Sequence, residues 1–108
     1  MKADTPETIQ VMLVDDHSMV RNGLRTFLMI YDDLDLVGEA ADGREAITVY
    51  SRTNPDVVLM DLKMPRMNGV EATRGLLARD PEACVVALTS FKDEALISEA
   101  LEAGARGY

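Results

Sequence analysis

Cysteine and tryptophan are scarce in this 108-residue sequence, which contains one cysteine and no tryptophan. Because Cys84 stands alone, the chain can form neither an internal disulfide nor a zinc site built from several cysteines. We therefore expect Cys84 to be a small, buried apolar residue. Histidine is equally scarce, and His17 without a spaced partner makes a poor transition-metal site. We interpret His17 as a loop or helix-start residue.

Positively charged residues are also few, and long apolar runs are absent from the sequence. Lysine and arginine number 11 against 19 aspartate and glutamate residues, which gives a net charge of -8. A surface of this sign repels nucleic-acid phosphates and anionic lipids but attracts a divalent cation, so we expect the chain itself to bind neither nucleic acid nor membrane. The start has no apolar signal region, and no run approaches the roughly 18 apolar residues that span a bilayer. These features predict a cytoplasmic protein.

The sequence does contain a regular alternation of short apolar runs and longer amphipathic stretches. The apolar runs predict strands at residues 9–14, 34–39, 56–61 and 84–89, and residues 106–108 are enough to begin a fifth. The run at 56–61 is so continuously apolar that we place it at the centre of the sheet. The stretches between the runs predict helices, so we expect one α/β domain over residues 9–108 behind an N-terminal tail of residues 1–8.

Local signals predict where the helices begin and end and which faces they bury. Ser18 and Asp42 are candidate N-caps, and Gly104 is a candidate C-cap. Apolar residues at helical spacing predict the buried faces of the first and last helices. The predicted faces are Val20, Leu24, Phe27, Leu28 and Tyr31 in the first helix, and Ala95, Leu96, Ala100 and Leu101 in the last.

Three carboxylates and one hydroxyl follow the strands of the predicted sheet. Asp15 and Asp16 come directly after the first strand, and Asp61 and Thr89 end the third and fourth. Because the carboxyl ends of parallel strands share one edge of the sheet, we expect these side chains to converge there. Gathered carboxylates repel one another, and a hard cation such as Mg²⁺ relieves that repulsion. The set suits phosphoryl transfer to a carboxylate.

Each of these residues also has a plainer interpretation when it is taken alone. Asp15 and Asp16 before a helix can be a cap with a favourable contact to the helix dipole. Asp61 can be a turn former, and Thr89 an ordinary strand-end threonine. The occurrence of all four at the ends of three different strands favours a joint site.

Four segments of the chain resemble the response-regulator receiver family. They are VDDH at residues 14–17, LMDLKMP at 59–65 with Asn68-Gly69, ALTS at 87–90 and AGARGY at 103–108. The resemblance runs from Val11 to Tyr108 and implies a flavodoxin-like, doubly wound parallel sheet with strand order 2-1-3-4-5. Strand 5 and helix 5 would be largely absent from this chain, and the family's invariant lysine, three residues after Tyr108, would lie beyond it.

The resemblance also implies a chemistry for the predicted site. Asp61 would be the phospho-acceptor. Asp16 and Asp61 would ligate Mg²⁺ directly, Asp15 would act through water, and the backbone carbonyl of Lys63 would complete the protein ligands. The chain would be a signalling domain that assists its own phosphorylation and dephosphorylation, and not a conventional enzyme.

Four further positions match residues that switch or modulate such domains. Thr89 is similar to the family's switch hydroxyl, which turns inward to the phosphoryl group, and Tyr108 matches the aromatic residue that follows it. Lys63 and Phe91 stand two residues beyond Asp61 and Thr89, where the family's side chains flank the path of the attacking water. A long cation and a bulky ring there predict slow loss of the phosphoryl group.

The partners follow from the same resemblance. A sensor histidine kinase would supply the phosphoryl group, and phosphorylation would favour a homodimer. Residues 15–24 (DDHSMVRNGL) look like the subfamily whose receiver precedes a LuxR/NarL-type helix-turn-helix domain. DNA would therefore be bound only through an output domain outside these 108 residues, in a longer protein that regulates transcription.

Two rival functions are disfavoured by particular positions. Aspartate-nucleophile phosphohydrolases use a second aspartate two residues after the first, where this chain has Lys63, and they need a substrate cap. A flavin- or nucleotide-binding module would need a glycine- or serine-rich phosphate loop after the first strand, where this chain has Asp15 and Asp16.

Overall fold

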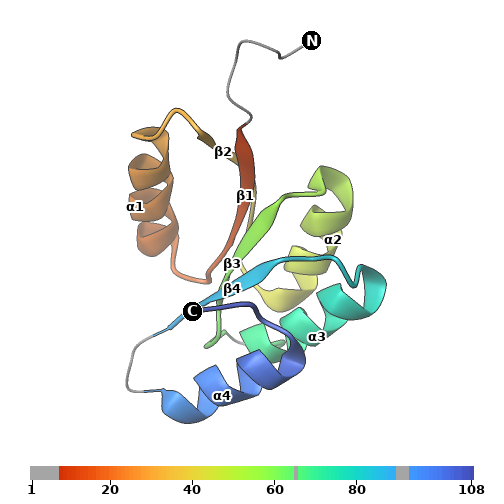
Figure 1. Cartoon of the computed structure of the whole chain (residues 1–108). Helices are drawn as coiled ribbons and strands as arrows, with labels where there is room; N and C mark the ends of the chain where they lie inside the picture. The colour runs from red at the N-terminus through yellow and green to blue at the C-terminus, as the bar shows by residue number, and fades with distance from the viewer. Residues whose placement is uncertain (1–7, 65, 90–92) are drawn as a thin grey trace.

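The computed structural model describes residues 8–64, 66–89 and 93–108, in which four parallel strands alternate with four helices (Figure 1). The order along the chain is β1 (Ile9–Val14), α1 (Ser18–Met29), β2 (Leu34–Ala40), α2 (Gly43–Thr53), β3 (Val57–Asp61), α3 (Gly69–Arg79), β4 (Val85–Leu88) and α4 (Glu94–Ala103). The strands lie in the order β2-β1-β3-β4. This confirms the predicted α/β fold and the central position of the third apolar run.

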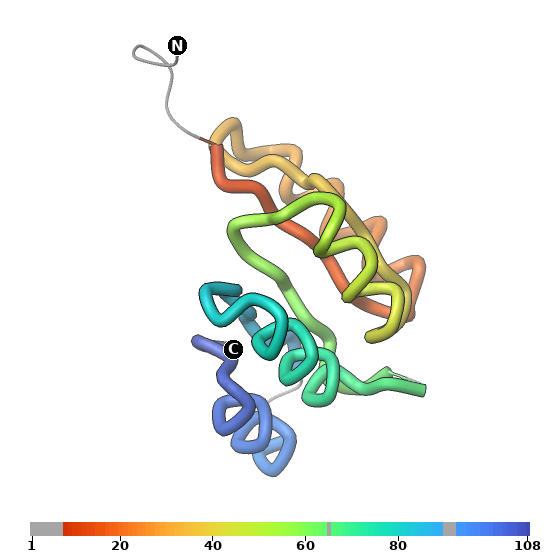
Figure 2. The backbone as a smooth tube through the Cα atoms, turned by 90° about the vertical axis from the view of Figure 1, so that its right-hand side faces the viewer, coloured from red at the N-terminus to blue at the C-terminus, as the bar shows by residue number. Residues whose placement is uncertain are grey.

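The helices cover the two faces of the sheet unequally. α2, α3 and α4 pack side by side on one face, and α1 lies on the other, mainly against β2 (Figures 1 and 2). Alternate residues of β1 point to the two layers: Met12 and Val14 join the core beneath α2 and α3, whereas Val11 and Leu13 join a smaller core with Leu28 of α1. The described helices contain no segment that is long and apolar enough to cross a membrane.

The last described residues add to the sheet beside β4, as predicted. Gly107 forms an isolated parallel bridge with Val86. The Arg106 amide donates to the Val85 carbonyl at 2.8 Å, and the Ala87 amide donates to the Gly107 carbonyl at 2.9 Å. Residues 106 and 107 therefore occupy the place where a fifth parallel strand begins.

The helix ends follow local signals in most cases. Asp42 caps α2, because its side chain accepts a hydrogen bond from the Glu45 amide at 2.8 Å, and Gly104 ends α4 with a φ of 113°. The prediction for Ser18 was wrong by one residue, since α1 begins at Ser18 and His17 occupies the N-cap without a side-chain capping bond. The His17 side chain turns instead toward the neighbouring carboxylates.

The predicted buried faces were only partly correct. In α1, Leu28 is buried, but Val20 and Phe27 are 45% and 52% exposed. Tyr31, which follows α1, is also exposed. In α4, Ala100 is buried and Leu96 is half-buried, whereas Ala95 and Leu101 are exposed. Helical spacing indicates which residues share a face but not how far the neighbouring layer extends over it. Cys84, which lies just before β4, is half-buried, whereas full burial was expected.

Candidate functional site

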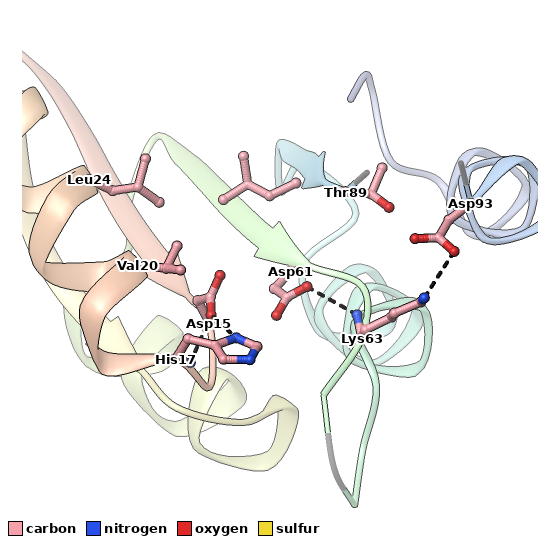
Figure 3. Close-up of a pocket in the computed structure, with 9 residues that line it drawn as sticks. Asp15, His17, Val20, Leu24, Asp61, Lys63, Thr89 and Asp93 are labelled. Atoms are coloured by element: carbon pink, nitrogen blue, oxygen red, sulfur yellow. Dashed lines mark hydrogen bonds and ion pairs between the residues drawn. The ribbon is translucent and has the colours of Figure 1, made fainter. Parts of the chain in front are cut away.

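The predicted carboxylates do converge at the carboxyl edge of the sheet. β1 and β3 are neighbours, and Val14 is paired with Met60. Asp15, which follows β1, therefore lies beside Asp61, which ends β3 (Figure 3). One possible ligand atom from each of Asp15, Asp16, His17 and Asp61 lies within 4.8 Å of all the others. The gathering of the three acids was predicted, whereas the presence of the His17 ring among them was not.

Asp15 is the most deeply buried of the three acids, with 6% of its surface exposed. Its Oδ1 accepts a hydrogen bond from the His17 amide at 2.8 Å and lies 3.1 Å from His17 Nδ1. Its own amide donates to the Ala40 carbonyl at 3.1 Å, which continues the β1–β2 ladder by one residue. These bonds fix the Asp15 backbone and one carboxylate oxygen within the loop.

Asp16 has a buried carboxylate oxygen, Oδ1, that receives no hydrogen bond from the described residues. His17 Nδ1 lies 3.1 Å away and forms an ion pair only when the ring is protonated. The hydrogen bond to Asp15, followed by the charge of Asp16, raises the pKa of His17 above 6.5. A buried carboxylate oxygen without a donor is costly, and a cation bound there would remove the cost. The residues present therefore fit a hard, oxygen-liganded ion.

Asp61 is half-buried at the end of β3. Its Oδ1 accepts a hydrogen bond from the Lys63 amide at 3.1 Å. Burial raises the pKa of Asp61 to about 6, and the negative charges of Asp15 and Asp16 act in the same direction, so together they outweigh the Lys63 amide. Such a carboxylate gains from a nearby cation, which stabilises its charged form.

The start of α3 holds the segment that follows Asp61. The Gly69 amide donates to the Leu62 carbonyl at 3.1 Å, and a Cβ atom added to Gly69 would lie 2.2 Å from the Asp61 carbonyl oxygen. Only glycine allows this approach. Asn68 and Glu71 form a reciprocal capping box that starts the helix. In the sequence, Asn68-Gly69 was only one of the segments that resemble the receiver family, and its role in supporting the backbone of Asp61 was not predicted.

The carboxylates lie in a cleft of about 480 Å³. Thr89, which follows β4, lies on the opposite side of this cleft from His17 (Figure 3). Apolar side chains form another part of the wall. The lining residues are Asp15, His17, Val20, Leu24, Asp61, Lys63, Leu88, Thr89 and Asp93. The structure thus brings Thr89 to the same cleft as the acids, as the strand ends predicted.

The sequence did not predict that two further charged residues lie at this site. Asp93 lines the cleft and forms an ion pair with Lys63, with 3.0 Å between Asp93 Oδ1 and Lys63 Nζ. Arg21 of α1 donates a hydrogen bond from its guanidinium group to the Asp15 carbonyl and lies 3.4 Å from Glu39 of β2. The position of Asp93, four residues after Thr89, was the only sequence signal for it.

Of the other predicted residues, Tyr108 and the side chain of Lys63 do not join the cluster of acids. Tyr108 is 72% exposed and lines a separate groove along α4 with Glu94, Ile97, Ser98 and Leu101. Phe91 lies outside the described residues. Lys63 contributes its amide to Asp61, while its side chain extends away from that carboxylate toward Asp93 (Figure 3).

Comparison with known proteins identifies the family. Residues 11–108 match the model of the response regulator receiver domain. The uncharacterized transcriptional regulatory protein YhcZ of Bacillus subtilis is 44% identical over 100 residues, which cover 93% of this chain and 47% of that protein. The chain spans about half the length of the curated relatives it matches.

Solved structures agree with this match. A LuxR-family two-component response regulator from Aurantimonas has a TM-score of 0.89 and 42% identity, with 94% of this chain and 73% of that chain covered. In the CheX–CheY complex from Borrelia burgdorferi, which contains BeF₃ and Mg²⁺, one chain is 30% identical with a TM-score of 0.83. That match covers 95% of this chain and 78% of the other.

Proposed function

The chain belongs to the response-regulator receiver family, and from this premise we propose that Asp61 accepts a phosphoryl group from a sensor histidine kinase. The observation that carries the proposal is the cluster of Asp15, Asp16 and Asp61, which contains a buried Asp16 oxygen without a hydrogen-bond donor in the described part of the chain. A carboxylate nucleophile beside a site for a hard cation is what phosphoryl transfer to aspartate needs. Similar proteins are named as transcriptional regulatory proteins, which fits a signalling role for the chain.

Mg²⁺ is the ion that suits this set of oxygen ligands. Asp16 and Asp61 would hold it directly, Asp15 through a water molecule, and the Lys63 carbonyl would complete the protein ligands. When bound, the ion supplies positive charge that offsets the charge of the incoming phosphoryl oxygens. The hydrogen bonds from the His17 amide to Asp15 and from the Lys63 amide to Asp61 hold two of these carboxylates in place for that task.

The transfer itself needs little from the chain beyond position and charge. The Asp61 carboxylate attacks phosphorus, a P–O bond forms, and the P–N bond to the kinase histidine breaks with the electron pair leaving on the imidazole nitrogen. The Thr89 hydroxyl, which lines the same cleft, donates a hydrogen bond to a phosphoryl oxygen of the product. Tyr108 follows this change from its exposed position beside α4.

The longer protein would turn this change into control of transcription. The chain spans about half of its curated relatives, several of which are transcriptional regulatory proteins. We therefore propose a cytoplasmic protein in which phosphorylation of the receiver favours a homodimer and directs a DNA-binding output domain. The acidic chain, with its net charge of -8, would contribute no DNA contact of its own.

Labelling with a small phosphodonor tests the proposal. With Mg²⁺ and phosphoramidate, the protein should gain one phosphoryl group, and Asp61→Ala should gain none. Asp35→Asn is the matched control, because Asp35 is an exposed acid at the far end of β2. Peptide mapping that places the label on Asp15 or Asp16 would contradict the assignment.

A second measurement separates this function from phosphohydrolysis. An aspartate-nucleophile phosphohydrolase would turn over a chromogenic phosphate ester many times. We expect stoichiometric labelling without such turnover, because Lys63 stands where those enzymes place their second aspartate. Sustained release of chromophore that depends on Asp61 would favour the enzyme instead.

A further inference from the structure

Lys63 and Asp93 form an ion pair in the lining of the cleft. Lys63 Nζ lies 3.0 Å from Asp93 Oδ1, and both residues line the cleft together with Asp61 and Thr89. Lys63 belongs to the segment after β3, and Asp93 directly precedes α4. The pair therefore links the segment after β3 to the start of α4 at the carboxyl edge of the sheet (Figure 3).

The Asp93 side chain does not cap α4, although Asp93 is the N-cap residue of that helix. The Asp93 carbonyl accepts the first helical hydrogen bond from the Ile97 amide at 3.0 Å, yet the side chain makes no capping bond. An N-cap aspartate is normally stabilised by accepting a bond from an amide of the first turn. Here the carboxylate, which is 20% exposed, is directed to the Lys63 ammonium.

Among the residues that the structure describes, Lys63 is the one lysine that lines the cleft, and the pair determines where its charge is held. The Lys63 amide is bonded to the Asp61 carboxylate, so the side chain starts beside the nucleophile, but Asp93 draws its ammonium toward α4 and away from that carboxylate (Figure 3). Lys63 itself is 67% exposed. An ion pair with so exposed a partner is weak, so its release requires little energy.

We propose that Asp93 is a positioning residue that withholds the Lys63 ammonium from phosphoryl groups entering the cleft. This inference rests on the proposed phosphorylation of Asp61. When a dianionic donor enters, the ammonium exchanges Asp93 for a phosphoryl oxygen and helps to hold the donor while the Asp61 P–O bond forms. Asp93 therefore competes with the donor for Lys63, and the strength of the pair sets the concentration of donor that the protein needs.

The test is a double-mutant cycle on the rate of phosphorylation. Phosphoramidate and Mg²⁺ serve as probes; the P–N bond of the donor breaks, ammonia leaves, and the P–O bond to Asp61 forms. With donor below saturation, Asp93→Asn should raise the initial rate about two- to fivefold, the range expected for a weak ion pair. The change should lie in the half-saturating donor concentration, with the maximal rate unaltered.

Lys63→Met removes the competing cation and decides between two causes. If Asp93 acts through Lys63, adding Asp93→Asn to Lys63→Met leaves the rate unchanged. If Asp93 only adds negative field to the cleft, the same two- to fivefold gain persists without Lys63, and the proposal is overturned. Asp93→Glu, which keeps the charge within reach of Lys63, should restore the rate of the unmodified protein.

One control variant and the labelling of the unmodified protein keep the outcome distinct from a failure of the proposed function. Glu102→Gln makes the same charge change at an exposed position near the other end of α4 and should leave the rate unaltered. If the unmodified protein takes no label, the proposed function fails, whereas normal labelling with no effect of Asp93→Asn refutes only the role of Asp93.

Discussion

The folded structure destabilises the ionised form of the Asp61 carboxylate. Its carboxylate is half-buried near two other acids, and burial with their charges raises its pKa to about 6 from 3.8. The folded chain therefore binds this proton more tightly than the unfolded chain does. Stability should fall as the pH rises through the window from about 4 to about 6 and stay low above it.

Asp61→Asn should consequently stabilise the protein when no divalent cation is present. The amide has almost the same shape but carries no charge, so above about pH 6 we expect a gain of about 1 kcal/mol after allowance for the partial exposure of the carboxylate. Chemical denaturation at pH 4 and pH 7.5 in EDTA measures it: the gain should be present at pH 7.5 and small at pH 4. A variant that is less stable at pH 7.5 would show that the Lys63 amide bond outweighs the repulsion.

The acids of the site could be predicted because their positions depend on the backbone alone. Once parallel strands were recognised, Asp15, Asp61 and Thr89 had to share one edge of the sheet. The roles of His17 and Asp93 could not be predicted in the same way. They depend on which of several rotamers a side chain adopts, and His17 turns to the acids and Asp93 to Lys63 when each could have capped a helix.

Among the elements, the junction between β3 and α3 has the tightest geometry. A Cβ atom on Gly69 would lie 2.2 Å from the Asp61 carbonyl oxygen and 2.7 Å from Leu62 Cα, both of which are backbone atoms that cannot turn aside. Gly23, inside α1, has nothing within 4 Å of the same atom. The two glycines therefore form a matched pair.

Gly69→Ala and Gly23→Ala should have opposite effects. Gly69→Ala must move backbone at the end of β3 and should destabilise the protein by roughly 1–3 kcal/mol, with loss of Mg²⁺ affinity because Asp61 moves too. Gly23→Ala should stabilise it by roughly 0.5–1 kcal/mol, because alanine loses less freedom in a helix. Thermal unfolding and calorimetric titration check both. Equal stability of the two variants would contradict the close approach seen at Gly69.

Ion pairs as well as apolar contacts hold α1 against β2. Glu39 of β2 accepts two hydrogen bonds from Arg25, at 2.7 and 2.8 Å, and lies 3.4 Å from Arg21. The hydrogen bond from Arg25 is the main cause that lowers the pKa of Glu39 below 4.5. A group with a lowered folded pKa contributes stability above its unfolded pKa and loses it as the pH falls through the folded value.

Glu39→Gln should therefore cost about 1 kcal/mol at pH 7, and the cost should shrink as the pH falls below the ordinary glutamate value. Denaturation curves of the variant and the unmodified protein from pH 7 to pH 3 measure the difference. Glu99→Gln, at an exposed position of α4, is the control, and its denaturation curves should match those of the unmodified protein at each pH. A pH-independent cost would show that Glu39 acts through packing and not through charge.

The helices and strands themselves were predictable from periodicity and turn residues, as the bounds of β1 and the Asp42 cap show. The burial of α1 was not. The spacing of Val20, Phe27 and Tyr31 correctly indicated an apolar stripe, but the stripe stays exposed because α1 packs mainly against β2. A sequence pattern states that a face is apolar, whereas its cover depends on the arrangement of the whole molecule.

At the scale of the whole molecule, two opposing properties govern association. Val20 and Phe27 of α1 are exposed, as is Tyr31 just after the helix, and Phe27 and Tyr31 form an edge-to-face pair with ring centroids 5.3 Å apart. Exposed apolar area of this kind favours self-association. The net charge of -8 opposes it, because two copies of the chain repel each other.

The 108-residue chain should therefore associate weakly in dilute salt and more strongly as salt rises. Salt at about 0.15 M reduces the Debye length to about 8 Å, which screens the repulsion and leaves the apolar attraction in place. Replacing Phe27 and Tyr31 by serine should return the chain to a monomer at every salt concentration. Met29→Ser is the matched control, because Met29 is 75% exposed and lies two residues from Phe27, which places it off the stripe. Sedimentation velocity at 20 and 300 mM salt separates the cases: association that weakens with salt, or that survives the double serine variant, would assign the contact to charged groups or to another surface.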